Sequence, residues 1–119
     1  MNSVQLIGNI GRTPILRRVG SGKAVLNLVI AVDTVRNTQG KRLINTNWFD
    51  VVVWGPQAEL QAEHLTKGSQ IAIQGTLNTR NWIDQNNNKR YNVEIVAHKI
   101  TWLDLKPRTT TTTDKEATI

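Results

Sequence analysis

The stretch that decides the fold is Trp-Phe-Asp-Val-Val-Val-Trp at residues 48–54. Its β-branched and aromatic residues predict a strand, in which side chains alternate between two faces. Phe49, Val51 and Val53 would then share one face. The second face consists of Trp48, Asp50, Val52 and Trp54. Because a carboxylate is seldom buried without a partner, we expect the first face to form core. The two tryptophans are left outside, where a bound ligand or a second subunit could cover them.

The composition points to one small domain with a polyanionic partner. The chain has 119 residues, and its 15 lysines and arginines outnumber 9 acidic residues to give a net charge of +6. Such a balance favours nucleic acid or an acidic membrane surface. Cysteine is absent, which excludes disulfides and thiolate chemistry. No signal peptide or long apolar run is evident, so we expect a cytoplasmic protein.

Outward from the central stretch, the alternation of apolar residues predicts four further strands. Their approximate ranges are 3–19 with an interruption at Gly11 and Pro14, 24–35, 70–82 and 89–103. In the 24–35 segment the even-numbered residues are continuously apolar and are predicted to form core. Glycine-rich or polar turns are expected at 20–23, 39–40 and 84–88. The alternation breaks near 97–99, so Trp102 cannot be placed.

One helix is predicted at residues 57–65, after Pro56 and with Gly68 as its C-terminal cap. Five strands with a single helix between the third and fourth indicate an all-β fold, a five-stranded Greek-key barrel of the OB type. The barrel domain is expected to span 1–106. Residues 107–119, rich in threonine, are predicted to form a flexible tail.

No enzyme signature stands out. The two histidines, His64 and His98, fall on a helix and a strand without neighbouring cysteines or clustered carboxylates. The few serines show no pairing with a base. We therefore expect no catalysis, no metal site and no cofactor.

The aromatic and basic residues together indicate single-stranded nucleic acid as the ligand. Trp82 follows Arg80 by two residues, so both should point the same way from a strand neighbouring that of Trp48 and Trp54. Flat rings stack on bases while cations neutralise phosphates, and a duplex would hide the base faces. The expected stacking residues are Trp48, Trp54 and Trp82. A basic tip of Arg36, Lys41 and Arg42 is expected at the end of a protruding β-arm between the second and third strands.

Several segments resemble bacterial single-stranded DNA-binding proteins of the homotetrameric OB-fold type. They are residues 2–11, Thr46-Asn47-Trp48-Phe49, 51–55, 65–71, Gly75-Thr76-Leu77, Thr79-Arg80-Asn81-Trp82 and Arg90-Tyr91. The resemblance implies stacking on Trp48 and Trp82, and on Trp54 where the family commonly carries a phenylalanine. It implies a tetramer, and roles in replication, recombination and repair. Phosphate contacts are implied for Arg17, Arg36, Lys67, Arg80 and Arg90.

Two positions depart from the family pattern. Val35 stands where well-studied members carry a further stacking tryptophan, so the β-arm should bind more weakly. The tail ends in Ile119 and lacks the acidic Pro-Phe tip that recruits replication and repair enzymes, so recruitment by that route is not expected. Two alternatives stay open from the residues alone: an OB-fold primosome accessory protein that binds other proteins, and a barrel that binds single-stranded RNA.

Overall fold

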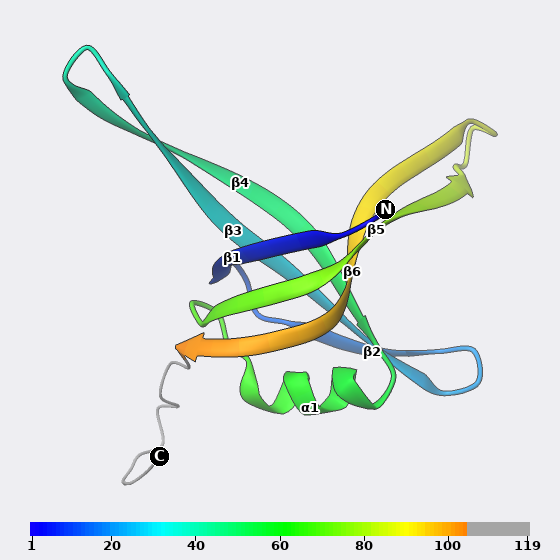
Figure 1. Cartoon of the computed structure of the whole chain (residues 1–119). Coiled ribbons are helices and arrows are strands. Elements are labelled where there is room, and N and C mark those ends of the chain that lie inside the picture. Colours follow the sequence, from blue (N-terminus) through cyan, green and yellow to red (C-terminus); the bar gives the residue numbers. More distant parts are fainter. Residues whose placement is uncertain (105–119) are drawn as a thin grey trace, which may run out of the picture.

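A computed structural model describes residues 1–104 of the chain, and within them six strands and one helix are formed (Figure 1). The elements are β1 (Val4–Ile10), β2 (Ile15–Val19), β3 (Lys23–Thr38), β4 (Lys41–Trp54), α1 (Pro56–His64), β5 (Gln70–Ile83) and β6 (Lys89–Asp104). The strands of the β-arm are longer than expected from sequence. The tail predicted at 107–119 lies outside the described residues.

Five strands close into a ring. Antiparallel pairs join β1 to β5, β5 to β6 and β4 to β3, and a short parallel pair joins β4 to β6. Pairing of Asn9 with Ala31 and of Ile10 with Ile30 then closes β3 onto β1. β2 continues the path of β1 after the break at residues 11–14 and pairs with β3. The predicted barrel with one helix is confirmed, and the sixth strand arises because the first predicted strand is split.

The core follows the predicted alternation. Leu26, Leu28 and Ile30 of β3 are fully buried, as are Val51 and Val53 of β4. Each such side chain stabilises the fold by about 1.5–3 kcal/mol through burial. The orientation expected for the central stretch is therefore correct.

Two valines on the outer face are nevertheless buried. Val52 lies on the outer face but is only 3% exposed, and Val25 on the same face is 1% exposed. Val25 lies between Arg17 of β2 and Trp54 of β4, and these larger side chains leave it little access to water. Val52 lies between β3 and β6 in the middle of the sheet. The outer face of β4 is therefore partly filled and not a simple row of exposed side chains.

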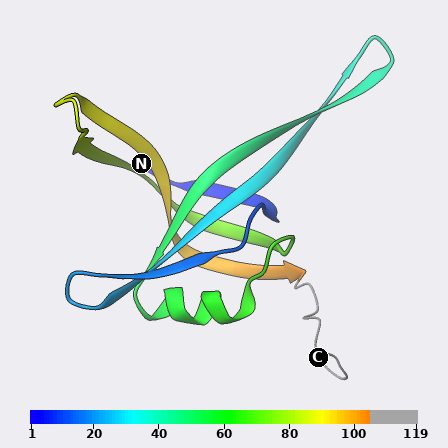
Figure 2. The same cartoon turned by 180° about the vertical axis from the view of Figure 1, so that it is seen from behind.

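The helix covers one end of the barrel, opposite the two long arms (Figures 1 and 2). Ala58 and Leu65 join the core cluster. The helix ends with Leu65 as its C-cap, whose N–H donates to the Gln61 carbonyl. The predicted cap at Gly68 is therefore wrong. Gly68 adopts a φ of +93° and donates its N–H to the Ile10 carbonyl, which ties the α1–β5 loop to the end of β1.

The alternation breaks near residue 97 because of a register shift between β5 and β6, one of two along this pair of strands. Gln74 pairs with Lys99 and Gly75 with Ala97, which leaves His98 as the extra residue of a bulge. A second shift between residues 70 and 71 precedes the pairing of Ile71 with Trp102. Trp102, which the sequence could not place, donates its indole N–H to Gln61 Oε1 at 2.7 Å.

Two hairpins extend beyond the barrel, and they are the main feature that positions the outer side chains (Figure 1). The β3–β4 arm ends at Gln39 and Gly40, whose φ values of +52° and +75° allow a tight turn that matches strand twist. The β5–β6 arm turns at residues 84–88, where the Asp84 carboxylate accepts the N–H groups of Asn86 and Asn88. Both predicted turns are confirmed.

Candidate nucleic-acid interface

Trp54 lies at the end of a row of side chains across three strands. Arg17 on β2 pairs with Val25 on β3, which pairs with Trp54 on β4. The Arg17 Nε–H donates to Asn27 Oδ1 at 3.1 Å, and Lys23 Nζ lies 5.6 Å from the centre of the Trp54 ring. The ring is 43% exposed. The Lys23 ammonium thus already lies over the Trp54 indole. When a base covers the ring, this ammonium could contact a phosphate instead.

Trp48 is the most exposed of the four tryptophans, at 61%. Its ring lies directly against the backbone of Gly11, because a Cβ built at Gly11 would come within 2.4 Å of the Trp48 Cζ3 atom. Gly11 is held in turn by its N–H, which donates to the Val29 carbonyl. Part of the Trp48 ring therefore packs on the backbone of Gly11, a contact that we call the seat of Trp48. Much of the indole stays open to solvent.

The seat predicts a specific effect of Gly11→Ala. Gly11 has no positive φ, so alanine fits its backbone, but the new methyl group must displace the Trp48 ring. We expect affinity for a single strand to fall about fivefold, the low end of the loss of one stacked base. Fluorescence titration measures the affinity, and urea denaturation checks that stability is kept. Unchanged affinity would show that the seat does not matter for binding.

Basic residues gather near this seat. Lys67 is exposed in the α1–β5 loop, which the bond from the Gly68 N–H to the Ile10 carbonyl holds beside Gly11. Arg12 follows Gly11 directly and is also exposed. Arg12 is not among the site residues predicted from the sequence. The contact between the end of β1 and the α1–β5 loop is what brings Arg12 close to Lys67.

Trp82 lies on the β5–β6 arm, directly opposite Arg90, and is 47% exposed. Arg80 and Asn92 form the next pair along the same face. Arg80, Trp82 and Asn92 line a hollow of about 240 Å³. An aromatic ring, a cation and an amide thus share one surface, as predicted for Arg80 and Trp82.

Both arginines of this arm already have carboxylate partners. Arg80 Nη1 lies 3.6 Å from Glu94 Oε1, and Arg90 Nε donates to Asp84 Oδ2 at 2.8 Å. The bond from Arg90, followed by that from the Asn88 N–H, lowers the pKa of Asp84. Each guanidinium has five N–H donors and is more than half exposed, so each can also contact a phosphate.

The register separates the predicted basic tip into two sides. Arg36 pairs with Leu43, and Lys41 with Thr38, on the side of the arm that continues the core face. Arg42 pairs with Asn37 on the side that carries Trp48. Val35 pairs with Ile44 on that same side, and both are exposed. An aliphatic pair therefore occupies the place where the resemblance leads one to expect a ring.

One expectation about the tryptophans was wrong. Trp82 does not lie on a strand next to that of Trp48 and Trp54, because β6 separates β5 from β4. The parallel pairing of β4 with β6 closes the barrel and produces this order. The three rings therefore lie on two strands that are not paired with each other, Trp48 and Trp54 on β4 and Trp82 on β5, with β6 between them.

The remaining candidates for chemistry have structural partners. His98 Nε2 and Thr76 Oγ1 lie 3.2 Å apart, and the His64 ring lies 4.7 Å from that of Trp102. Within residues 1–104, no group of three or more histidine, aspartate or glutamate residues could hold a metal ion. No helix in this part of the chain is long and apolar enough to cross a membrane.

Comparison with known proteins agrees with this geometry. Residues 1–103 match the single-strand binding protein family. The chain is 40% identical over 108 residues to single-stranded DNA-binding protein 1 of Xylella fastidiosa, covering 89% of this chain and 79% of the relative.

Two solved structures have the same fold. One is the Plasmodium falciparum SSB in complex with single-stranded DNA, with a TM-score of 0.78, 25% identity, and 87% of this chain and 96% of the other covered. The second is a deletion mutant of the single-stranded DNA-binding protein from Thermus aquaticus, with a TM-score of 0.76, 30% identity, and coverage of 87% and 51%. With its OB-type barrel and the match over residues 1–103, this chain belongs to the single-strand binding protein family.

Proposed function

We propose that this protein binds single-stranded DNA without regard to sequence, by stacking bases on Trp48, Trp54 and Trp82 and by neutralising phosphates with arginine and lysine. Membership of the family supports single-stranded DNA as the ligand and a role without catalysis. The observation that carries the stacking mechanism is the 61% exposed indole of Trp48, seated on Gly11 beside a basic loop. Phosphate contacts are proposed for Arg17, Arg36, Lys41, Arg42, Lys67, Arg80 and Arg90.

The biological setting follows the family. We place the protein in the cytoplasm with the nucleoid, coating strands exposed during replication, recombination and repair. Its coating would remove hairpins and block nucleases, because bases held on indole rings cannot pair.

A titration of tryptophan fluorescence tests the proposal. We expect strong quenching by single-stranded DNA, little by duplex DNA, and weaker binding at 200 mM than at 50 mM salt as released counterions oppose it. A matched RNA strand separates the DNA-binding function from the RNA alternative. Equal quenching by duplex would contradict base stacking. A protein-binding platform would instead show no response to either nucleic acid.

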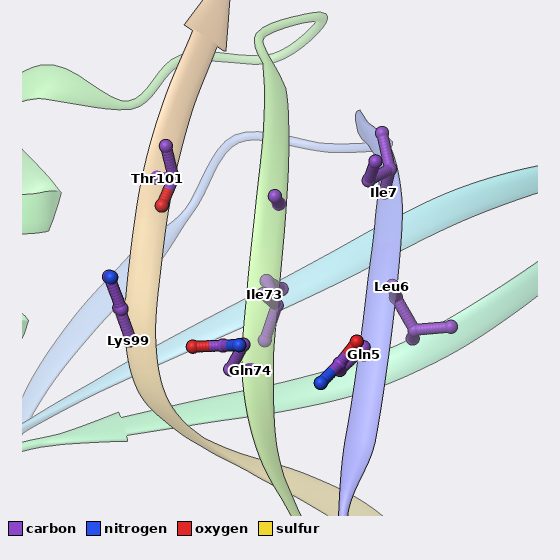
Figure 3. Close-up of a pocket in the computed structure, with 8 residues that line it drawn as sticks. Gln5, Leu6, Ile7, Ile73, Gln74, Lys99 and Thr101 are labelled. Atoms are coloured by element: carbon purple, nitrogen blue, oxygen red, sulfur yellow. The ribbon is translucent and has the colours of Figure 1, made fainter.

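We also propose that four copies assemble, and that the outer face of β1, β5 and β6 takes part. Two rows of paired residues cross these strands, Gln5–Gln74–Lys99 and Ile7–Ala72–Thr101 (Figure 3). They line a shallow hollow of about 480 Å³, and Ile7 in it is 59% exposed. Among the described residues, β1 pairs with β3 only at Asn9 and Ile10, so one edge of residues 4–7 has no paired strand. A free strand edge next to a face that exposes Ile7 supports pairing with a second copy.

Ile7→Glu tests this surface. We expect the variant to form a smaller species than the unchanged protein, because a charge placed between copies would have no partner. Light scattering coupled to size exclusion gives the mass. Leu60→Glu, an exposed leucine on α1, is the matched control and should keep the native mass. An unchanged mass for Ile7→Glu would place the interface elsewhere.

A further inference from the structure

Asp50 is an acidic side chain on the face proposed to hold DNA. It pairs with Val29 of β3 and shares its side of β4 with Trp48 and Trp54. It is exposed, although the protein as a whole carries a net charge of +6. A carboxylate here repels phosphates, so a favourable contact with the ligand would have to be made to hydrogen-bond donors of the bases.

Asp50 differs from three other carboxylates of the arms and the adjoining strands. Asp33 accepts the Thr46 hydroxyl at 2.6 Å, Glu94 lies 3.6 Å from Arg80, and Asp84 accepts Arg90. Within residues 1–104 the Asp50 carboxylate has no hydrogen bond or ion pair with another side chain. Its oxygens are therefore free to accept donors from a ligand.

The strand geometry sets which part of a ligand Asp50 can reach. Residues two apart on a strand lie about 7 Å apart on one face. A base stacked on Trp48 would direct one edge along the strand, and the carboxylate would reach toward that edge. A carboxylate only accepts hydrogen bonds, through two parallel oxygens. Among the four bases, guanine alone presents two adjacent parallel donors, N1–H and N2–H, on its pairing edge.

Resting on the proposed stacking at Trp48, we propose that Asp50 is a specificity residue that accepts the N1–H and N2–H of a guanine stacked there. The other bases fit less well, because each places an acceptor atom beside its donor on that edge and would repel one carboxylate oxygen. Binding to single strands would then be general, through stacking and charge, with a preference for guanine at one position of the face.

The test compares strands that differ only in the donor pattern. One alternates thymine with 7-deazaguanine, which keeps the pairing edge but prevents quadruplexes. The second replaces it by 7-deazahypoxanthine, which lacks the N2 amine, and the third is all thymine. We expect the unchanged protein to bind the first about fivefold more tightly than the second or third, a modest value for a bidentate contact at an exposed site.

Asp50→Asn should remove this preference, because the amide presents one donor and one acceptor. Asp33→Asn is the matched control: it removes one negative charge from the same face and should leave the ratio between strands unchanged. No guanine preference in the unchanged protein, or a preference that survives Asp50→Asn, would overturn the proposal. So would a uniform rise in affinity with the ratio intact, since the carboxylate would then only repel phosphates.

Trp48→Ala distinguishes a failure of the proposed role of Asp50 from a failure of the proposed stacking at Trp48. If that variant binds all three strands as well as the unchanged protein does, stacking at Trp48 is wrong and the proposed face with it. If Trp48→Ala weakens binding while Asp50→Asn leaves the preference unaltered, the proposed function stands and only the role of Asp50 fails.

Discussion

Trp48→Ala and Trp82→Ala should each weaken binding to a long thymine strand by about 1–3 kcal/mol, the contribution of one stacked base. The double variant should lose roughly the sum, because the rings lie on β4 and β5 with β6 between them, so their effects should be nearly independent. Fluorescence anisotropy of a labelled strand measures the affinity. Urea denaturation should show little change, since both rings are about half exposed or more.

Trp102→Phe is the matched control for these variants. Trp102 donates a hydrogen bond to Gln61 of α1, away from both arms, so its loss should leave the affinity for DNA unchanged. Salt dependence separates stacking from charge. The tryptophan variants should keep the slope of log affinity against log salt, whereas Arg17→Ala should reduce it by about 0.7 if one phosphate contact is lost. Native affinity in both single variants would refute stacking on these rings.

The sequence predicted the barrel because its signals are local. Alternation in residues 24–35 and 48–54 identified the core face, and the turn at Gln39 and Gly40 was visible from its residue types. Pro56 likewise marked the start of the helix. Each of these features depends on residues near in sequence, so no knowledge of distant contacts was needed.

The features that the sequence did not predict depend on which strands become neighbours in the fold. The parallel pairing of β4 with β6 separates Trp82 from Trp48 and Trp54. The residue pattern of β4 or of β6 does not predict this pairing. Val52 is buried although it lies on the outer face, because β3 and β6 flank it on both sides. The seat of Trp48 on Gly11 joins residues far apart in the chain. The stacking residues could thus be named from sequence, but their supports and mutual arrangement could not.

Gly75→Ala should destabilise the barrel by about 1–3 kcal/mol, the usual range for overpacking, and toward its upper end because the neighbouring atoms cannot move aside. Gly75 lies at the register shift between β5 and β6. A Cβ there would come within 2.1 Å of the Val96 carbonyl oxygen and 2.9 Å of its carbon, both backbone atoms of the neighbouring strand. Relief requires that β6 move away from β5, which breaks pairs that close the ring.

Gly11→Ala is the control variant for Gly75→Ala, because the two substitutions add the same methyl group in different surroundings. Neither glycine has a positive φ, so alanine is allowed by the backbone at both positions. At Gly11 the new methyl group meets an exposed ring that can turn away, whereas at Gly75 it meets the backbone of β6. We therefore expect Gly11→Ala to lose affinity but keep stability, and Gly75→Ala to lose stability first. Urea denaturation at one fixed protein concentration measures the stability of both variants, since assembly would make stability depend on concentration, and fluorescence titration measures their affinity. A Gly75→Ala protein as stable as the unchanged chain would mean that β5 and β6 can separate at the bulge without loss of the barrel.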